Sequence, residues 1–95
     1  MTRWRTDYLV AIERATRSAP EVQFGASVRG AIGMMRGSKA LAAFADREYV
    51  VPDDVKSVAA SVLRHRIVLK PEAELDGVRP DDVVARILSN VAVPR

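Results

Sequence analysis

Four stretches of the chain place apolar side chains at the three-to-four-residue spacing of an amphipathic helix. They run from about Asp7 to Ser18, from about Ser27 to Ala45, from Val51-Pro52 onward and from Arg79-Pro80 onward. The pattern predicts an all-α fold, a small bundle of about four helices. The expected core positions are Tyr8, Leu9, Ile12 and Ala15; Val28, Ile32, Met35, Leu41 and Phe44; Val55, Val58, Ala59, Val62 and Leu63; and Val83, Val84, Ile87, Leu88 and Val91.

The third and fourth helices begin in the same way, with a proline followed by two aspartates. Proline suits the first helical position, where its missing N–H costs nothing, and acidic side chains there face the positive end of the helix dipole. Adjacent carboxylates are also typical of acid–base catalysis. We interpret Asp53/Asp54 and Asp81/Asp82 as helix-start residues, because this position is ordinary for them.

The second predicted helix contains three glycines, Gly30, Gly33 and Gly37. Each costs about 1 kcal/mol relative to alanine in a helix interior. Such glycines often mark the close approach of another helix, so we expect this helix to lie centrally. The alternative is a break or kink near Gly37.

Two short segments rich in β-formers, Tyr49–Val51 and Arg66–Leu69, flank the third helix. They could pair as a tiny two-stranded ribbon. The segment from Lys70 to Val78 is polar and is interpreted as a connector.

Composition limits the classes of function. With 95 residues the chain forms one domain with a modest core. It has no cysteine, which excludes disulfides and thiolate metal sites, and its apolar runs are too short to span a membrane. The net charge of +3 is spread along the chain and is not gathered into a basic tail.

Groups for catalysis are scarce. The one histidine, His65, lies between Arg64 and Arg66 with no nucleophile at a suitable spacing, so we expect a structural or surface role and no metal site. Gly25 and Gly30 have the first spacing of a phosphate-binding P-loop, but the lysine and hydroxyl that must follow are absent. The chain alone therefore has no catalytic residues and is not an ATPase.

One segment does point to a ligand, Gly25-Ala26-Ser27-Val28-Arg29. Ser27 is a good N-cap, but Arg29 then falls in the first helical turn, where a cation opposes the helix dipole. A bound anion would remove this conflict, because the free backbone N–H groups and the guanidinium would meet on the same phosphate. A solvated arginine is the alternative.

Over nearly its full length, from about Asp7 to Arg95, the sequence resembles the C-terminal lid domain of MoxR-family AAA+ ATPases. The order and spacing of the matching segments are more specific than any one of them. These segments are Tyr8–Arg17, Gly25–Arg29, Lys39–Ala42, Arg47–Lys56, Val62–Leu69, Glu72–Leu75 and Val83–Arg95.

The resemblance implies that residues 1–95 are a single lid domain, a piece of a larger ATPase whose P-loop core is absent. Gly25–Arg29 matches the family's sensor 2 motif, so Arg29 would contact the terminal phosphate of ATP and Ser27 would cap the same helix. ATP would be bound mainly by the missing core, which would also hold the magnesium. Two departures are Val28 in place of the family's proline and Val51 in place of a capping threonine, the latter weakening a helix start by about 1 kcal/mol.

The resemblance also implies what the parent protein does. It would be a cytoplasmic enzyme that couples ATP hydrolysis to chaperone-like remodelling or maturation of partners carrying a von Willebrand factor A domain. The lid's own partners would be its AAA+ core and the neighbouring subunits of a ring, expected to be a hexamer, with no membrane and no nucleic acid.

A different class remains open, a small basic helical domain that binds nucleic acid or serves as an adaptor. The 15 Lys and Arg residues permit it. Against it, the cations are not grouped: Arg29 and Arg36 are two turns apart, and the third helix has only Lys56 and Arg64.

Overall fold

The computed structural model describes residues 3–25 and 27–94, with only the backbone of Arg3 and Val28. Within these ranges the chain forms five helices and one two-stranded antiparallel ribbon. This confirms the predicted small helical bundle with a tiny ribbon. The elements are α1 (Arg3–Ser18), β1 (Val22–Phe24), α2 (Val28–Phe44), α3 (Pro52–Leu63), β2 (Val68–Leu69), α4 (Pro71–Leu75) and α5 (Pro80–Asn90).

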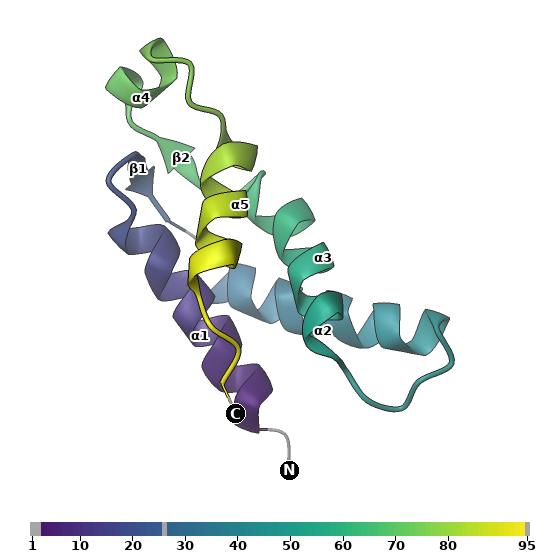
Figure 1. The fold of residues 1–95 in the computed structure, drawn as a ribbon. Coiled ribbons are helices and arrows are strands. Elements are labelled where there is room, and N and C mark those ends of the chain that lie inside the picture. Colours follow the sequence, from purple (N-terminus) through teal and green to yellow (C-terminus); the bar gives the residue numbers. More distant parts are fainter. Residues whose placement is uncertain (1–2, 26, 95) are drawn as a thin grey trace.

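The bundle is elongated, measuring 43 × 23 × 22 Å. In Figure 1, α5 lies between α1 and α3, α2 crosses behind them, and the ribbon and α4 form one end. α2 packs mainly on α3 and also on α1, while α5 contacts both α1 and α3. α2 crosses one side of the bundle and leaves one of its faces exposed, so it is not the centrally buried helix expected from its glycines.

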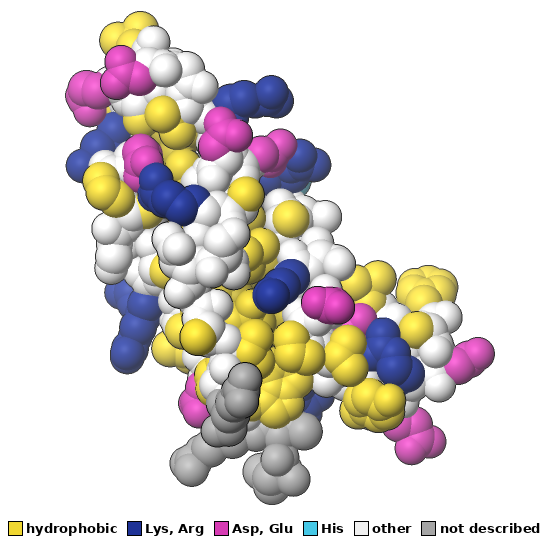
Figure 2. All heavy atoms as spheres, in the orientation of Figure 1, with side chains coloured by type: hydrophobic (Ala, Val, Ile, Leu, Met, Phe, Trp, Pro, Cys, Tyr) yellow, Lys and Arg dark blue, Asp and Glu magenta, His cyan; other side chains and the backbone are white. Residues whose placement is uncertain are grey.

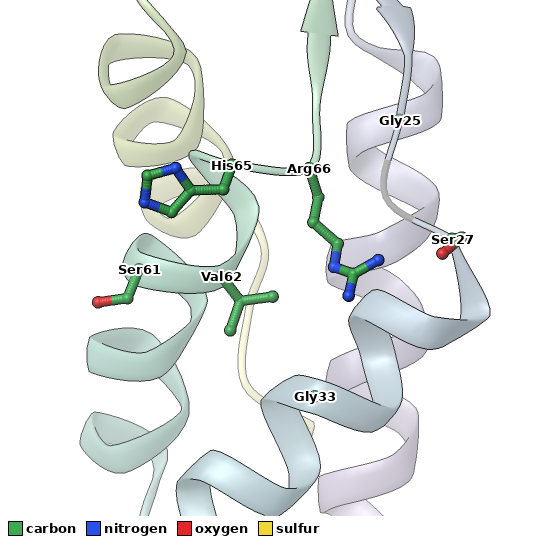
Figure 3. Close-up of a pocket in the computed structure, with 7 residues that line it drawn as sticks. All are labelled: Gly25, Ser27, Gly33, Ser61, Val62, His65 and Arg66. Atoms are coloured by element: carbon green, nitrogen blue, oxygen red, sulfur yellow. The ribbon is translucent and has the colours of Figure 1, made fainter.

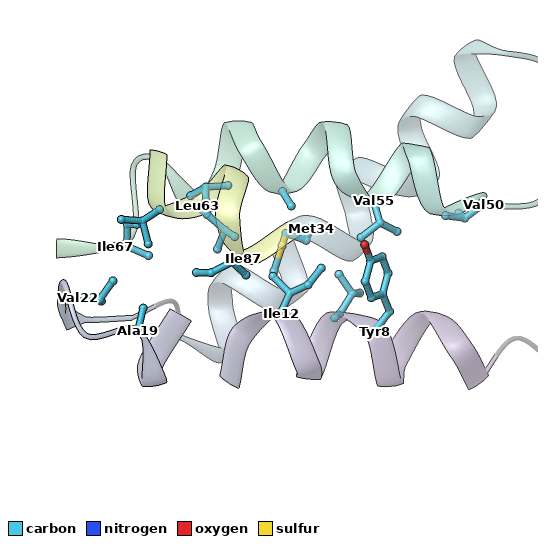
Figure 4. Packing of buried hydrophobic residues seen from close by; sticks show 14 of the residues in the cluster. Tyr8, Ile12, Ala19, Val22, Met34, Val50, Val55, Leu63, Ile67 and Ile87 are labelled. Carbon is cyan, nitrogen blue, oxygen red and sulfur yellow. The ribbon is translucent and has the colours of Figure 1, made fainter. Parts of the chain in front are cut away.

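The core fills the space between the four longer helices, as Figure 4 shows. Each of them contributes a side chain that is at most 5% exposed: Ile12 from α1, Met34 from α2, Leu63 from α3 and Ile87 from α5. The apolar stripes predicted for the first, third and fourth helices, which are α1, α3 and α5, are therefore confirmed as the faces that form the core.

α2 buries a different face from the predicted one. Three of its predicted core residues, Ile32, Leu41 and Phe44, are exposed by 47, 37 and 87%. Met34, Ser38 and Ala42 are buried instead, and the Ser38 hydroxyl donates a 2.6 Å hydrogen bond to the carbonyl of Met34. Of the other two residues predicted to lie in the core, Met35 is half-buried and Val28 has a side chain that is not among those described. A helix rich in glycine and alanine packs through its small residues, so its larger apolar side chains no longer mark the buried face.

α2 is continuous through Gly37, which excludes the predicted alternative of a break. α3 comes closest at this point: a Cβ on Gly37 would lie 2.6 Å from Cγ1 of Val58. One turn earlier, a Cβ on Gly33 would lie 3.9 Å from Cγ1 of Val62. The glycines therefore mark a close helix–helix approach, and Gly37 is its tightest point.

The ribbon differs from the predicted one in its first strand. β1 pairs antiparallel with β2, with Val22 opposite Leu69 and Phe24 opposite Val68. The prediction of a strand at Tyr49–Val51 was wrong, because that segment is the loop before α3. The buried side chain of Val50 explains its apolar sequence.

The structure also contains one helix that was not predicted and one helix that begins earlier than predicted. The predicted connector Lys70–Val78 contains the one-turn helix α4. α1 begins at Arg3, four residues before the predicted Asp7. Its additional first turn places the centroid of the Trp4 ring 6.4 Å from that of the Tyr8 ring.

The paired aspartates act at helix starts, as predicted. A carboxylate oxygen of Asp54 accepts a 2.9 Å hydrogen bond from the Val51 N–H, and one of Asp82 accepts a 3.2 Å bond from the Arg79 N–H. Arg47 donates two further bonds to Asp54, of 2.7 and 2.8 Å. These bonds from Arg47, with the one from Val51, hold the pKa of Asp54 at about 2. Asp54 thus stabilises the start of α3 by accepting the bond from Val51 N–H. Val51 itself has no hydroxyl with which to cap the helix.

Charges of both signs are interspersed over the face shown in Figure 2, and apolar side chains gather in the lower part of the view, from the C-terminal end of the chain toward the end of α2. Several arginines are taken up in ion pairs: Arg64 with Asp81, Arg86 with Glu21, and Arg17 with Glu13. In the part of the chain that the structure describes, no helix is long and apolar enough to cross a membrane.

Candidate functional site at the start of α2

Ser27 occupies the N-cap of α2, as predicted. Its backbone is extended, with φ −92° and ψ 178°, and its carbonyl accepts the first helical hydrogen bond, from Ala31 at 3.2 Å. The Ser27 side chain makes no capping bond in the described structure and is exposed. An N-cap hydroxyl ordinarily bonds a backbone N–H of the first turn. Here the hydroxyl is left available to a ligand. Ala26, just before it, lies outside the described residues.

Gly25 fixes where α2 begins relative to α1. A Cβ on Gly25 would lie 2.8 Å from the backbone nitrogen and from Cγ of Arg17, and 2.8 Å from the hydroxyl oxygen of Thr16. The contact with the main-chain nitrogen of Arg17 cannot be relieved by turning a side chain. The glycine therefore allows β1 to run against the last turn of α1 on its way to α2. It positions the site without contributing a functional group.

Arg29 lies in the first turn of α2 and is exposed. The sequence Val28–Phe44 has no acidic residue, so α2 itself offers Arg29 no partner. Nor does any other described residue form an ion pair or hydrogen bond with its side chain, whereas Arg47, Arg64 and Arg86 each hold a carboxylate with two nitrogens. The guanidinium of Arg29 is therefore free to take an external anion.

A hollow of about 570 Å³ lies between the start of α2 and the end of α3. Gly25 and Ser27 line one side, and Ser61, His65 and Arg66 line the other. In Figure 3 the Arg66 side chain extends toward the first turns of α2, while the His65 ring lies on the α3 side. The structure thus brings Ser27 to this hollow, whereas Arg29, on the outer face of α2, does not line it.

Arg66 is the residue that sequence reasoning missed. It was predicted only as the beginning of a strand. Its neighbour Ile67 is a β-branched apolar residue and is 6% exposed, so the chain returns to the core directly after Arg66. Arg66 itself lies in the turn that follows α3, and no local pattern indicates that its side chain extends toward the start of α2.

The chemistry of these groups suits the binding of an anion. Hydroxyl, guanidinium and helix N–H groups are donors that match phosphate oxygens. His65 is exposed, as predicted, and has no hydrogen-bonded nucleophile among the described residues. The described residues also contain no group of three His, Cys, Asp or Glu that would hold a metal ion. The start of α2 therefore offers hydrogen-bond donors to an anion.

The fold and the sequence match a known family. The family model of the AAA lid domain matches residues 14–87, which include both sides of the hollow and the exposed start of α2. The chain belongs to this family of AAA lid domains.

Individual relatives indicate which group of AAA lid domains the chain belongs to. The chain is 39% identical to the chaperone MoxR1 of Mycobacterium tuberculosis over 94% of its length and 26% of the relative's. It is 42% identical to the uncharacterized protein YeaC of Bacillus subtilis, covering 93% of the chain and 28% of the relative. A Cytophaga hutchinsonii structure with a provisional ATPase assignment superposes with a TM-score of 0.88 and 36% identity, covering 94% of the chain and 30% of that protein. The chain is a lid of the MoxR-like AAA+ ATPase group.

These relatives are much longer than the chain, which spans between 26 and 30% of each. A more distant likeness is to the magnesium-chelatase subunit ChlI of Cyanophora paradoxa, with 43% identity over 67% of the chain and 19% of the relative. The chain therefore matches one part of each of these longer relatives.

Proposed function

We propose that this lid closes over ATP bound to the core of its parent ATPase, and that Arg29 contacts the terminal phosphate. The observation that carries the proposal is the free guanidinium of Arg29 in the first turn of α2, where it opposes the helix dipole and has no partner among the described residues. The open hydroxyl of Ser27 and the orientation of Arg66 support it, because both add donors at the same end of the helix.

In this mechanism the lid reports whether the terminal phosphate is present. A charge-assisted hydrogen bond contributes about 1.5 to 3 kcal/mol, enough to shift a hinge between an open and a closed state. When hydrolysis removes the phosphate, Arg29 loses its partner and the open state is favoured. The parent would use this cycle, in a ring of subunits, to remodel or mature client proteins, including those with a von Willebrand factor A domain.

The test is Arg29→Ala in the intact parent protein. Losing one contact of about 1.5 to 3 kcal/mol corresponds to about a tenfold to hundredfold loss in whichever step depends on it, either ATP turnover or its coupling to the client. The lid should stay folded, because Arg29 is exposed and makes no described contact. Arg14→Ala is the matched control, an exposed arginine on α1 with no described partner. Unchanged turnover, nucleotide affinity and coupling in Arg29→Ala would refute the sensor role.

The nucleic-acid alternative predicts a different result for the same protein. Binding to phosphates of DNA releases counterions and weakens steeply as salt rises. We expect no specific binding of duplex DNA at physiological salt, as measured by fluorescence anisotropy. A salt-sensitive, sequence-dependent complex would favour the alternative.

A further inference from the structure

A second hollow, separate from the one beside Ser27, lies on the outer side of the α1–α2 contact. It measures about 320 Å³, and its floor is apolar, formed by Leu9 and Val10 of α1 and by Ala31, Ile32 and Met35 of α2. Val10 and Ile32 are 40 and 47% exposed. Apolar side chains of this size, adjacent on two helices and open to water, are typical of a surface that another protein covers. We refer to this hollow as the α1–α2 groove.

The charges at the groove have one sign on α2. Arg36 and Lys39 line its edge, and α2 contains no acidic residue. Neither side chain has a hydrogen bond or ion pair with any residue that the structure describes. An apolar floor with two free cations at its rim complements a surface that presents apolar side chains beside carboxylates.

The α1–α2 groove lies along the same face of α2 as Arg29, the proposed phosphate contact. Arg29, Ile32, Arg36 and Lys39 are three, four and three residues apart, so they follow one face of α2. All four are exposed. At 1.5 Å of rise per residue, Lys39 lies only about 15 Å along the helix from Arg29. A domain that offers a phosphate to Arg29 is therefore broad enough to cover the groove as well.

We infer that the α1–α2 groove is the docking surface for the nucleotide-carrying core of the same polypeptide, which would insert an apolar side chain flanked by Asp or Glu when the lid closes. The inference rests on the proposed function, since it takes the core that holds the phosphate as the partner. It adds which face of the lid meets that core and what chemistry the core presents.

Two observations favour the chain's own core over a client or a neighbouring subunit. The relatives have about 70% or more of their length outside the region matched by this chain, enough for a complete core domain. A lid tethered to that core meets it at a high effective concentration, so a groove as small as this one suffices for a contact that must open in every cycle.

The test uses a photo-crosslinker placed at Ile32 in the parent protein. The lid has no cysteine, so Ile32→Cys, in a parent whose other cysteines have been replaced, provides a single attachment point for a thiol-linked benzophenone. Val68→Cys is the matched control, because Val68 is also β-branched and is 49% exposed, against 47% for Ile32. Both proteins are irradiated with ATP and without it, then analysed on denaturing gels and by peptide mass spectrometry.

The expected product from Ile32→Cys has the mass of one subunit and joins the groove to an acidic segment of the core, with a higher yield in the presence of ATP. The charge reversals Arg36→Glu and Lys39→Glu, added together, should lower this yield at least about tenfold, because two rim contacts become repulsive. A product with the mass of two subunits, a product formed only with an added client, or a yield no higher than that of Val68→Cys would each overturn the inference.

Failure of this inference is distinguishable from failure of the proposed function. If Arg29→Ala slows ATP turnover while Ile32→Cys gives no crosslink above the control, the sensor role stands and the groove assignment is wrong. If the crosslink to the core forms but Arg29→Ala changes nothing, the groove assignment stands without the sensor.

Discussion

Gly37 of α2 and Val58 of α3 are in contact so close that a methyl group on Gly37 would lie 2.6 Å from Cγ1 of Val58. Both residues belong to the largest helix–helix contact of the domain. Valine has a short, stiff side chain that cannot swing away. The separation of α2 and α3 is therefore set at this point by the absence of a side chain.

We expect Gly37→Ala to destabilise the domain by up to about 2 kcal/mol, since overpacking costs about 1 to 3 kcal/mol and the better helix propensity of alanine returns about 1. Gly33→Ala is the control, because its methyl group would lie 3.9 Å from Val62, an ordinary contact distance. It should leave the domain as stable or raise its stability by up to about 1 kcal/mol. Urea unfolding followed by circular dichroism gives both values, and a stabilised Gly37→Ala would contradict the account.

Tyr8 is fully buried, and its hydroxyl has no hydrogen-bond partner among the described residues. Figure 4 shows the ring reaching from α1 toward Val55 of α3. Burial, together with the negative charge of Asp53, raises the pKa of Tyr8. A buried hydroxyl without a partner costs about 1 to 3 kcal/mol in lost hydration.

Tyr8→Phe removes this hydroxyl and keeps the ring. We expect the free energy of unfolding to rise by about 1 kcal/mol or more, because this cost is removed. Tyr49→Phe, at a side chain that is 60% exposed, provides the comparison and should have no effect. A loss of more than about 1 kcal/mol in Tyr8→Phe would mean that the hydroxyl has a partner, such as a buried water.

The Arg47–Asp54 pair makes stability depend on pH in the acid range. The bonds from Arg47, and then the one from Val51, lower the pKa of Asp54 from 3.8 to about 2, so the unfolded chain takes up its proton first. The pair therefore contributes its full stabilisation above about pH 4 and loses it as the pH falls toward 2. Glu21, whose pKa is lowered to about 2 chiefly by hydrogen bonds from Arg86, adds to the same acid lability.

Asp54→Asn should be less stable than the wild type at pH 7, and the difference should narrow below about pH 3. Thermal unfolding at a series of pH values measures it. Asp53→Asn is the neighbouring control, since it removes an equal charge without touching Arg47. A stability difference for Asp54→Asn that stays constant from pH 7 to pH 2 would show that the lowered pKa is not what links this pair to pH.

Two residues beyond Phe44, the last residue of α2, Asp46 has a left-handed backbone conformation with φ 59°. The N–H of Arg47 reaches back to the carbonyl of Ala42 at 2.9 Å, and that of Asp46 to Ala43 at 3.0 Å, which is the double closure usually built on glycine. Asp46→Gly should raise the melting temperature, since it relieves about 0.5 to 1 kcal/mol of backbone strain. Asp46→Ala removes the same charge but keeps the Cβ, so a comparable gain in Asp46→Ala would assign the effect to charge instead.

Arg29→Lys in the parent protein separates charge from geometry. Lysine keeps the positive charge but cannot form two parallel bonds to a phosphate. We expect turnover and coupling to recover only partly relative to Arg29→Ala. Full recovery would show that a point charge suffices and that no bidentate contact is made. Arg36 is unsuitable as a control here, because it lines the α1–α2 groove.

Local start signals made much of this fold predictable. The proline followed by two aspartates predicted the first residue of α3 and of α5 correctly, and Ser27 predicted the start of α2. What the sequence could not provide was the packing of α2. Its glycines and alanines allow either side to approach a neighbour, so the choice of buried face came from tertiary contacts with α1 and α3.

For the ribbon and the site, too, some features could be predicted from the sequence and others depend on tertiary packing. β1 has three residues, of which only Val22 is buried, too short a pattern to recognise, whereas β2 lay within a predicted segment. For the site, the position of Arg29 followed from its distance to a capping serine. The approach of Arg66 from the end of α3 depends on how two distant segments pack, which no local pattern records.

Gly25 gives the start of α2 a mechanical role. Its main chain is wedged against Thr16 and Arg17, and only three peptide links separate it from Val28, a span of about 11 Å at full extension. The first turn of α2 could therefore not move farther than this span from Gly25 without displacing the end of α1 as well. Because α1 also packs on α2 and α5, such a displacement would be shared by the rest of the bundle.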